Sequence, residues 1–293
     1  MIDAFSGPME RRAHRMRIGI MQGRLSPPRP GRLQAFPWPS WESEFEQAAA
    51  CGFDSIEWLI EADRHEENPI LSAAGIEQIR ARVAATGPTV SSLCADYFMA
   101  HPFFRVSSVE RARSVDMLQT LVVHAAEAGI RTLLVPVLEE AELRTEAEKA
   151  ILIDALREPL ALARSRGVRI GLETELPAGE YRALVERAGD PALGVYYDTG
   201  NATAKGFDIG ADIGTLGPYL CGVHIKDRAR GGTSVWLGCG DADFANFFDA
   251  LAKTGYAEAV VLQTPSGEAF LDAARTQRQF VERHLRRESI PSR

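Results

Sequence analysis

Four polar side chains in the second half of the sequence stand at the ends of short apolar runs. Glu173, Asp198, His224 and Gln263 are separated by 25, 26 and 39 residues. Two carboxylates and an imidazole are ligand types that suit a divalent cation such as Mn2+, Mg2+, Co2+ or Zn2+. Charged groups are rarely buried without a partner, so polar groups in register on neighbouring strands would need a common one. For each residue taken alone, the alternative is a hydrogen-bonded side chain of the core.

The apolar runs that carry these residues have the length and composition of strands buried on both faces. They lie at 17–21, 54–60, 89–95, 131–137, 168–173, 193–198, 221–226 and 259–263. Amphipathic stretches between them predict helices. The clearest are 40–51, 107–128 and 145–166, each of which opens on Ser or Thr and is followed by Gly. Weaker helical patterns occupy 71–86, 178–189, 208–216, 243–254 and 267–286.

Eight strand-and-helix units of about 34 residues each predict a parallel sheet closed into a single (β/α)8 TIM barrel over residues 17–286. The alternative, an open doubly wound sheet, requires a glycine-rich phosphate loop after the first strand, and MQGRLSPP (21–28) has one Gly. Residues 1–16 are interpreted as a disordered or loosely attached N-terminal extension and 287–293 as a polar tail. The Pro-rich segment 27–39 is expected to shape one wall of the site.

Composition excludes several classes of protein. The chain has 293 residues, of which 45% are hydrophobic and 25% charged, and this is typical of a soluble globular protein rather than a disordered one. No apolar run is long enough to span a membrane. The net charge of -7 gives no general attraction to nucleic acid. Four scattered cysteines are expected to be free thiols in the cytoplasm.

Several motifs resemble those of the xylose isomerase-like TIM barrels, a family of sugar and sugar-phosphate isomerases and epimerases that includes endonuclease IV. The matching segments are GLE at 171–173, YYDTGN at 196–201, VHIKDR at 223–228 and LGCGDADF at 237–244. The resemblance extends over residues 16 to about 285. It implies one divalent metal ion held by Glu173, Asp198, His224 and the residue at the end of the eighth strand.

That last position is normally Glu in the family and is Gln263 in this sequence. A carboxamide oxygen can coordinate a cation but cannot accept a proton at neutral pH. In the family's ketose 3-epimerases two glutamates act as opposing acid and base, and only Glu173 remains here. A substitute would have to come from Lys226, Glu57 or Asp96. The ligand set and the cation together would also be neutral rather than carry the usual charge of -1.

Other residues are predicted to contact a substrate. Asn201 stands where related epimerases often use His, and Arg230 stands where a substrate-binding Arg is expected. Lys226, Arg228 and Arg24 could add positive charge for a phosphate or carboxylate, although solvated loop charges are the alternative. Glu57, at the end of the second strand, and Asp96, which follows the third, could bind hydroxyl groups or pair with the arginines.

These observations predict a metal-dependent sugar or sugar-phosphate isomerase or epimerase in which Glu173 and Lys226 are catalytic and proton transfer passes through an enediolate. One alternative is a metal-dependent lyase or dehydratase acting on a keto-inositol or 3-keto-sugar, which needs only one base. Another is a barrel that binds sugar without catalysis. The six histidines are too few and too scattered for a trinuclear nuclease site. The expected partner is a small sugar or sugar phosphate rather than nucleic acid or membrane, and a homo-oligomer is compatible with the sequence.

Overall fold

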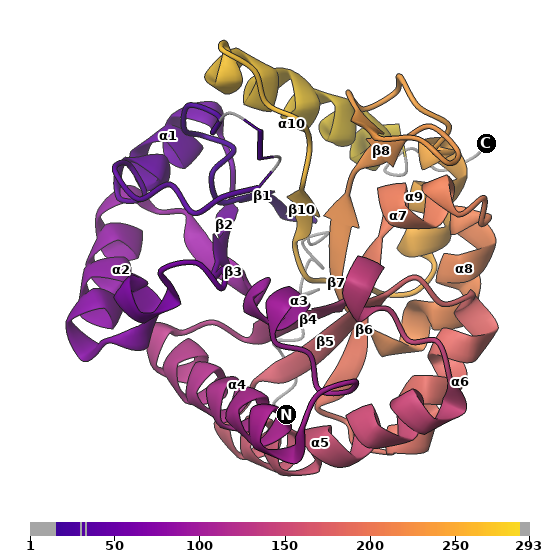
Figure 1. The fold of residues 1–293 in the computed structure, drawn as a ribbon. Coiled ribbons are helices and arrows are strands. Elements are labelled where there is room, and N and C mark those ends of the chain that lie inside the picture. Colours follow the sequence, from indigo (N-terminus) through magenta and orange to yellow (C-terminus); the bar gives the residue numbers. More distant parts are fainter. Residues whose placement is uncertain (1–15, 30, 33, 288–293) are drawn as a thin grey trace, which may run out of the picture.

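The computed structural model describes residues 16–29, 31–32 and 34–287. Its centre is a closed barrel of parallel strands in the order β1-β10-β7-β6-β5-β4-β3-β2. The strands are β1 (Ile18–Met21), β2 (Ser55–Leu59), β3 (Thr89–Cys94), β4 (Thr132–Val137), β5 (Arg169–Thr174), β6 (Leu193–Asp198), β7 (Leu220–Ile225) and β10 (Val260–Leu262). A helix follows each of them along the chain, so the fold is the predicted (β/α)8 barrel (Figure 1).

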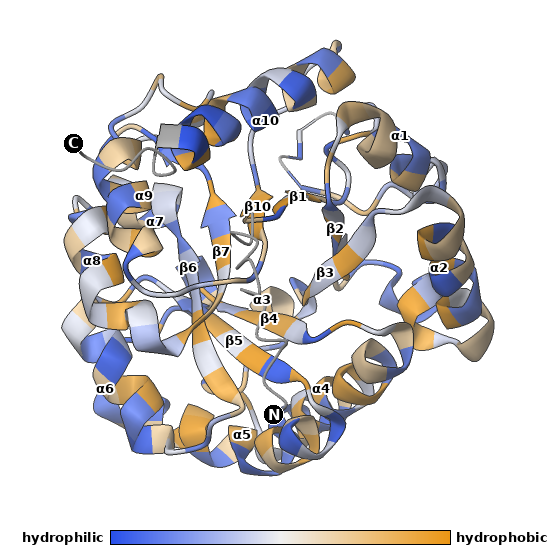
Figure 2. Ribbon diagram, turned by 180° about the vertical axis from the view of Figure 1, so that it is seen from behind, coloured by the Kyte–Doolittle hydropathy of each residue, from blue (hydrophilic) through white to orange (hydrophobic). Residues whose placement is uncertain are grey.

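The main helices form the outer ring of the barrel, as Figure 1 shows. They are α1 (Ser43–Cys51), α2 (Ala73–Thr86), α4 (Ser108–Ala128), α5 (Glu146–Arg166), α6 (Ala178–Ala188), α8 (Ile209–Leu216), α9 (Phe244–Ala252) and α10 (Phe270–Arg287). The strands β4, β5 and β7 carry hydrophobic residues, whereas α6 and α10 carry hydrophilic stretches (Figure 2). This distribution buries the strands on both faces and leaves one side of each helix for solvent.

Local sequence signals explain most of the helix boundaries. Ser107 with Glu110 and Thr145 with Glu148 form capping boxes at the starts of α4 and α5, and Gly129 and Gly167 end these helices in the left-handed conformation. The predicted cap of the first helix is wrong.

Glu42 rather than Ser40 precedes α1, and its side chain caps no backbone group. Ser40 lies instead in a turn, where its amide donates to Pro37 O over 2.9 Å and its hydroxyl contacts that of Ser26 at 2.8 Å. The prolines before it hold the chain in turns until Glu42.

Several short elements that the sequence patterns did not predict lie between the larger ones. They are α3 (Tyr97–Ala100), α7 (Thr199–Ala204), the antiparallel pair β8 (Asp227–Arg228) and β9 (Ser234–Val235), and the 3-10 turns η1 (His65–Glu67), η2 (Pro69–Leu71), η3 (Glu139–Ala141) and η4 (Gly217–Tyr219). Most follow the carboxyl ends of barrel strands, where loops carry the functional groups of this architecture.

The predicted extension 1–16, apart from its last residue, and the predicted tail 287–293, apart from its first, lie outside the described residues. The four cysteines are free thiols, and Cys51, Cys94 and Cys221 are buried while Cys239 is exposed. Among the described residues, no helix combines the length and the apolar character needed to cross a bilayer.

Candidate active site and metal centre

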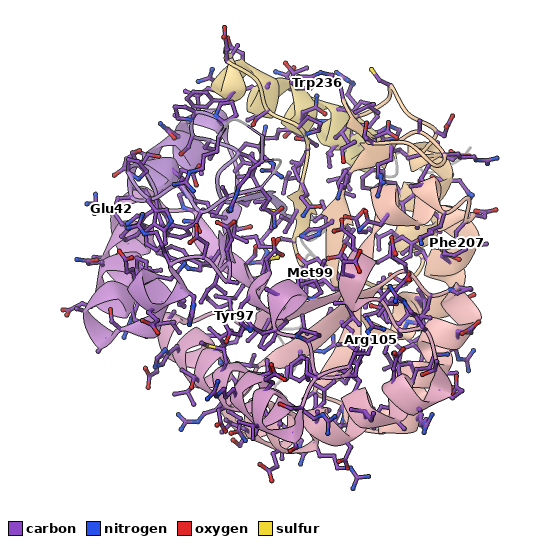
Figure 3. The ribbon with its side chains drawn as sticks, in the orientation of Figure 1. Glu42, Tyr97, Met99, Arg105, Phe207 and Trp236 are labelled. Carbon is purple, nitrogen blue, oxygen red and sulfur yellow. The ribbon has the colours of Figure 1, made fainter. Side chains whose placement is uncertain are left out.

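A cavity of about 620 Å3 opens at the carboxyl ends of the barrel strands. Its polar lining includes Glu173, Asn201, Lys226, Arg228 and Gln263, together with Asp96. Its apolar lining includes Met99, Ala100, Pro136 and Leu138. Figure 3 shows Met99 close to the middle of the ring, whereas Glu42, Phe207 and Trp236 lie towards its periphery.

Barrel register brings three predicted ligands together, and one of them, Glu173, lines this cavity. Asp198 and His224 are directly paired across β6 and β7, and Glu173 lies in the neighbouring strand β5. His224 Nδ1 is 3.7 Å from both Glu173 Oε2 and Asp198 Oδ2, and all three residues are buried. One ligand atom from each residue lies within 4.8 Å of the others, a separation that allows one cation to contact all three.

Unpartnered polar atoms in this group indicate what the site is built to hold. Asp198 is the N-cap of α7, and its Oδ1 accepts a hydrogen bond of 2.7 Å from the backbone amide of Asn201. Its Oδ2 is buried and has no hydrogen-bond partner in the structure. His224 Nδ1 is likewise buried and unpartnered. Because buried polar atoms are normally satisfied, these two atoms and the nearby carboxylate of Glu173 fit a divalent cation.

A second buried carboxylate orients the imidazole from the opposite side. Glu57 Oε1 lies 2.5 Å from His224 Nε2, and Glu57 Oε2 accepts hydrogen bonds from Tyr196 and from Ser92 Oγ, the latter over 2.6 Å. Glu57 is completely buried and does not line the cavity. The structure therefore places this predicted substrate contact behind His224, where it acts on the imidazole rather than on a ligand in the cavity.

The Glu57–His224 pair controls which imidazole nitrogen faces the cavity. Burial lowers the pKa of His224, but the charge and hydrogen bond of Glu57, with Glu173 and Asp198, outweigh it and raise the pKa to about 9. Burial also opposes the charge of Glu57, yet His224, Ser92 and Tyr196 hold its pKa below the ordinary value. With the Nε2 proton directed at Glu57, Nδ1 is the nitrogen left for a cation.

Glu173 is a buried carboxyl group whose charge is disfavoured in the metal-free protein. Burial raises its pKa to about 8, with the charge of Asp198 adding to the shift and those of His224 and Lys226 opposing it. Its Oε1 accepts a 2.9 Å hydrogen bond from Asn201 Nδ2. Asn201 thus contacts a predicted ligand directly while also lining the cavity.

Lys226 lies beside Gln263 and close to Asn201 and Asp198. Its Nζ is 2.9 Å from Gln263 Oε1, 3.4 Å from Asn201 Oδ1 and 3.6 Å from Asp198 Oδ2. Arg228 donates to Asn201 Oδ1 over 3.0 Å and to Gly232 O. The structure therefore joins Lys226, Asn201, Arg228 and Gln263 in one polar network.

Two predicted substrate contacts lie away from the cavity. Arg24 is buried beside a separate small cavity of about 30 Å3, and burial lowers its pKa to about 10 although Glu44 opposes the shift. Arg230 is exposed in the turn between β8 and β9, where its amide donates to Asp241 Oδ2 over 2.8 Å. Neither side chain lines the main cavity. The physical reason is that Arg24 is buried near Glu44, whereas Arg230 lies in an exposed turn.

Gln34 is a cavity residue that the sequence patterns missed. Its Nε2 donates to Asp96 Oδ2, and its Oε1 accepts a 2.9 Å hydrogen bond from Gln263 Nε2. Burial raises the pKa of Asp96 to about 6, while Cys94 and Gln34 oppose the shift as donors. The Pro-rich segment after β1 does form part of the cavity wall, through Arg32 and Gln34. No local motif marks Gln34, because its partners come from β3 and β10.

The fold and the cavity define a class of protein that comparison with known families identifies. A model of the xylose isomerase-like TIM barrel family matches residues 45–284, and the chain belongs to this family. It is 25% identical over 227 residues to L-ribulose-5-phosphate 3-epimerase UlaE of Escherichia coli strain ATCC 8739. The aligned region covers 74% of this chain and 79% of that relative.

Solved structures share the same barrel. A structure of L-ribulose 3-epimerase superposes with a TM-score of 0.75 and 22% identity, over 94% of this chain and 97% of the other. A xylose isomerase-like TIM barrel protein from Mycobacterium smegmatis in complex with magnesium gives a TM-score of 0.69 and 18% identity, over 93% and 97% of the two chains. The predicted isomerase or epimerase class agrees with what the named relatives do.

Proposed function

We propose that this protein is a divalent-metal-dependent isomerase or epimerase of sugars or sugar phosphates that moves a proton at the carbon next to a carbonyl group. The observation that carries the proposal is the buried group of Glu173, Asp198 and His224 in a closed barrel, in which His224 Nδ1 and Asp198 Oδ2 make no hydrogen bond. The epimerase names of its relatives support the reaction class.

Glu173, Asp198 and His224 would hold the cation, and Gln263 could add a carboxamide oxygen. A cation bound there would act as a Lewis acid towards the oxygen atoms of a keto-sugar. With the cation bound, this site would have no net charge rather than -1, and it would therefore stabilise negative charge that develops on a substrate oxygen better than a site with a second glutamate. The magnesium found in the Mycobacterium smegmatis structure supports a divalent metal in this family.

Glu173 is proposed to remove the proton. Its carboxylate lines the cavity, where it can reach a proton of a bound substrate. The side-chain amide of Asn201 donates a 2.9 Å hydrogen bond to Glu173 Oε1, and this bond limits the positions from which the carboxylate can act. A carboxylate that lines the cavity and is fixed by one neighbour is positioned for proton abstraction.

Lys226 is proposed to return the proton. It lies next to Gln263, the position at which the family has a second glutamate, and its ammonium group lines the cavity. Gln263 cannot exchange a proton at neutral pH. Glu57 lies behind His224, so of the three substitutes considered for the second acid, Lys226 is the one adjacent to the missing carboxylate.

The presence of Gln263 in place of a second glutamate also fits a different reaction at the same site. Elimination needs one base and a Lewis acid, so a lyase acting on a keto-inositol or 3-keto-sugar would not require a second glutamate. The two reactions differ in their products, because elimination forms an unsaturated compound that has lost water or an alcohol. Mass spectrometry of the reaction mixture separates them.

The test is exchange of the α-carbon proton with solvent deuterium. The purified protein would be incubated with Mn2+ and a panel of ketoses, keto-polyols and their phosphates in D2O, and exchange would be followed by proton NMR. We expect exchange in at least one compound, and loss of at least 100-fold in Glu173→Gln. Glu180→Gln, which changes an exposed carboxylate paired with Lys149, is the control and should retain the rate. Absence of exchange in every compound contradicts the proposal.

A further inference from the structure

We propose that Gln34 is a positioning residue, which together with Asp96 fixes the side-chain amide of Gln263 so that its oxygen faces Lys226 and the predicted cation. This inference rests on the proposed function, because it concerns the same metal site. It gives the long loop after β1 a specific role in the chemistry. It also explains how Gln can occupy a position where the family has Glu.

A glutamine at a ligand position has an orientation problem that a glutamate does not have. Both oxygens of a carboxylate accept hydrogen bonds and bind cations, so a half-turn of the group changes nothing. A carboxamide has one oxygen and one NH2 group, and the half-turn would point two donors at a cation. The side chain of Gln263 therefore serves the site only if its neighbours select one of the two orientations.

The neighbours of Gln263 select that orientation from both sides. Asp96 is an acceptor when ionised, so it takes a hydrogen bond from the NH2 group of Gln34. This leaves Gln34 Oε1 to accept from Gln263 Nε2 over 2.9 Å. On the other side Lys226 can only donate, and its Nζ donates to Gln263 Oε1 over 2.9 Å. An acceptor at one end and a donor at the other give the chain of hydrogen bonds a single direction.

The protein also holds Gln34 in place. The amide of Phe36 donates to Glu61 Oε2 over 2.6 Å, and Arg32 pairs with Glu61 Oε1 at 3.1 Å. Asp96 is fixed in turn by a 3.1 Å contact from Cys94 Sγ to its Oδ1. The segment on either side of Gln34 is thus held by Glu61, which follows β2, and the carboxamide of Gln34 is held by Asp96 after β3 and Gln263 after β10.

A double-mutant cycle between Gln34 and residue 263 tests the inference. The four proteins are the wild type, Gln34→Leu, Gln263→Glu and the double variant. Mn2+ affinity by isothermal titration calorimetry is the first readout, and the separate kcat and KM values for any active ketose are the second. Gln34→Met, which keeps the length of the side chain, repeats the test if Gln34→Leu lowers the melting temperature. Gln78→Leu on the exposed face of α2 is the matched control.

We expect Gln34→Leu to weaken Mn2+ binding about tenfold when residue 263 is Gln, and by less than twofold when it is Glu, because a carboxylate needs no orientation. The variant should lower kcat more than it raises KM. Equal losses in both backgrounds would show a purely structural role and overturn the inference, as would no loss in either. If the wild type binds no Mn2+, the proposed function fails and the inference fails with it, whereas binding unaffected by Gln34→Leu refutes the inference alone.

Discussion

Glu57 Oε1 and His224 Nε2 lie 2.5 Å apart, although the two residues are 167 positions apart in the chain and come from β2 and β7. Both side chains are completely buried. A histidine that ligates a metal commonly donates its other ring proton to a carboxylate, which fixes the tautomer and makes the ligating nitrogen more basic. Glu57 has this relationship to His224, and its own charge is supported by Ser92 and Tyr196.

The Glu57→Gln substitution should therefore weaken metal binding without removing a ligand. The carboxamide keeps one acceptor for His224 but loses the negative charge that makes Nδ1 a strong ligand. We expect the affinity for Mn2+ to fall by about 10- to 100-fold, measured by calorimetry. Glu180→Gln on the exposed face of α6 serves as the control. Unchanged affinity in Glu57→Gln would mean that the pair is a structural contact and does not tune the ligand.

The Gln263→Glu substitution should have the opposite effect on the metal. It adds a negative charge to a ligand set that is neutral with the cation, and it restores a group that can carry a proton. We expect Mn2+ to bind at least about tenfold more tightly, since each added carboxylate strengthens binding of a hard cation. Gln78→Glu on α2 is the surface control. If Gln263→Glu binds Mn2+ as the wild type does, Gln263 is not a ligand position.

Gly222 is required by the packing of Tyr196 inside the barrel. A Cβ at Gly222 would lie 2.1 Å from Tyr196 Cε2, and that ring is buried and hydrogen-bonded to Glu57. Gly222→Ala should therefore cost about 1–3 kcal/mol of the free energy of unfolding, measured with urea. It should also weaken Mn2+ binding through displacement of Tyr196 and Glu57.

Gly214→Ala provides the matched control for this prediction. Gly214 lies in α8, and nothing is within 4 Å of the Cβ that Ala would add. Replacing a helical Gly by Ala should raise the free energy of unfolding by about 0.5–1 kcal/mol. The two Gly-to-Ala substitutions are thus expected to have opposite signs. A stable Gly222→Ala variant would contradict the packing that the structure shows.

A buried glutamate away from the metal site predicts a pH dependence of stability. Glu44 accepts hydrogen bonds from the amides of Gly23 and Leu25, and burial raises its pKa from 4.5 to about 7 although these bonds and Arg24 oppose the shift. Between these two pH values the folded protein keeps a proton that the unfolded chain has released. The contribution of Glu44 to stability therefore falls as pH rises from 4.5 to 7.

Comparison with Glu44→Gln isolates this effect, because the variant cannot titrate at that position. The free energy of unfolding of Glu44→Gln relative to the wild type should increase by up to about 3 kcal/mol between pH 4.5 and pH 7. Urea unfolding of both proteins at pH 4.5, 6 and 7.5 measures the difference. A constant difference across this range would show that the pKa of Glu44 is the same in the folded and unfolded states.

Local patterns were sufficient to predict most of the fold. The capping boxes at Ser107 and Thr145 and the glycines after α4 and α5 depend on residues within a few positions of one another, so the sequence displays them directly. The strand ends at Asp198 and His224 were predictable for a similar reason. A parallel barrel brings the carboxyl ends of its strands to one rim, so counting the strands places these residues together.

Contacts between distant segments explain what the sequence did not reveal. Glu57 was expected to bind substrate, but its partner His224 lies on a strand across the barrel interior. Gln34 gave no signal, because it contacts Gln263, a residue 229 positions later in the chain, only once the barrel has folded. Arg24 and Arg230 were assigned by charge and spacing alone, and the direction in which a loop side chain points depends on how the loop packs.

Binding of Mn2+ to the metal-free protein tests the central claim most directly. Isothermal titration calorimetry should show one equivalent bound by the wild type, loss of that binding in His224→Ala, and full retention in His124→Ala, whose histidine lies on the outer helix α4. Metal analysis after dialysis should give the same order. Equal metal content in the wild type and His224→Ala would contradict the assignment of Glu173, Asp198 and His224 as a metal site.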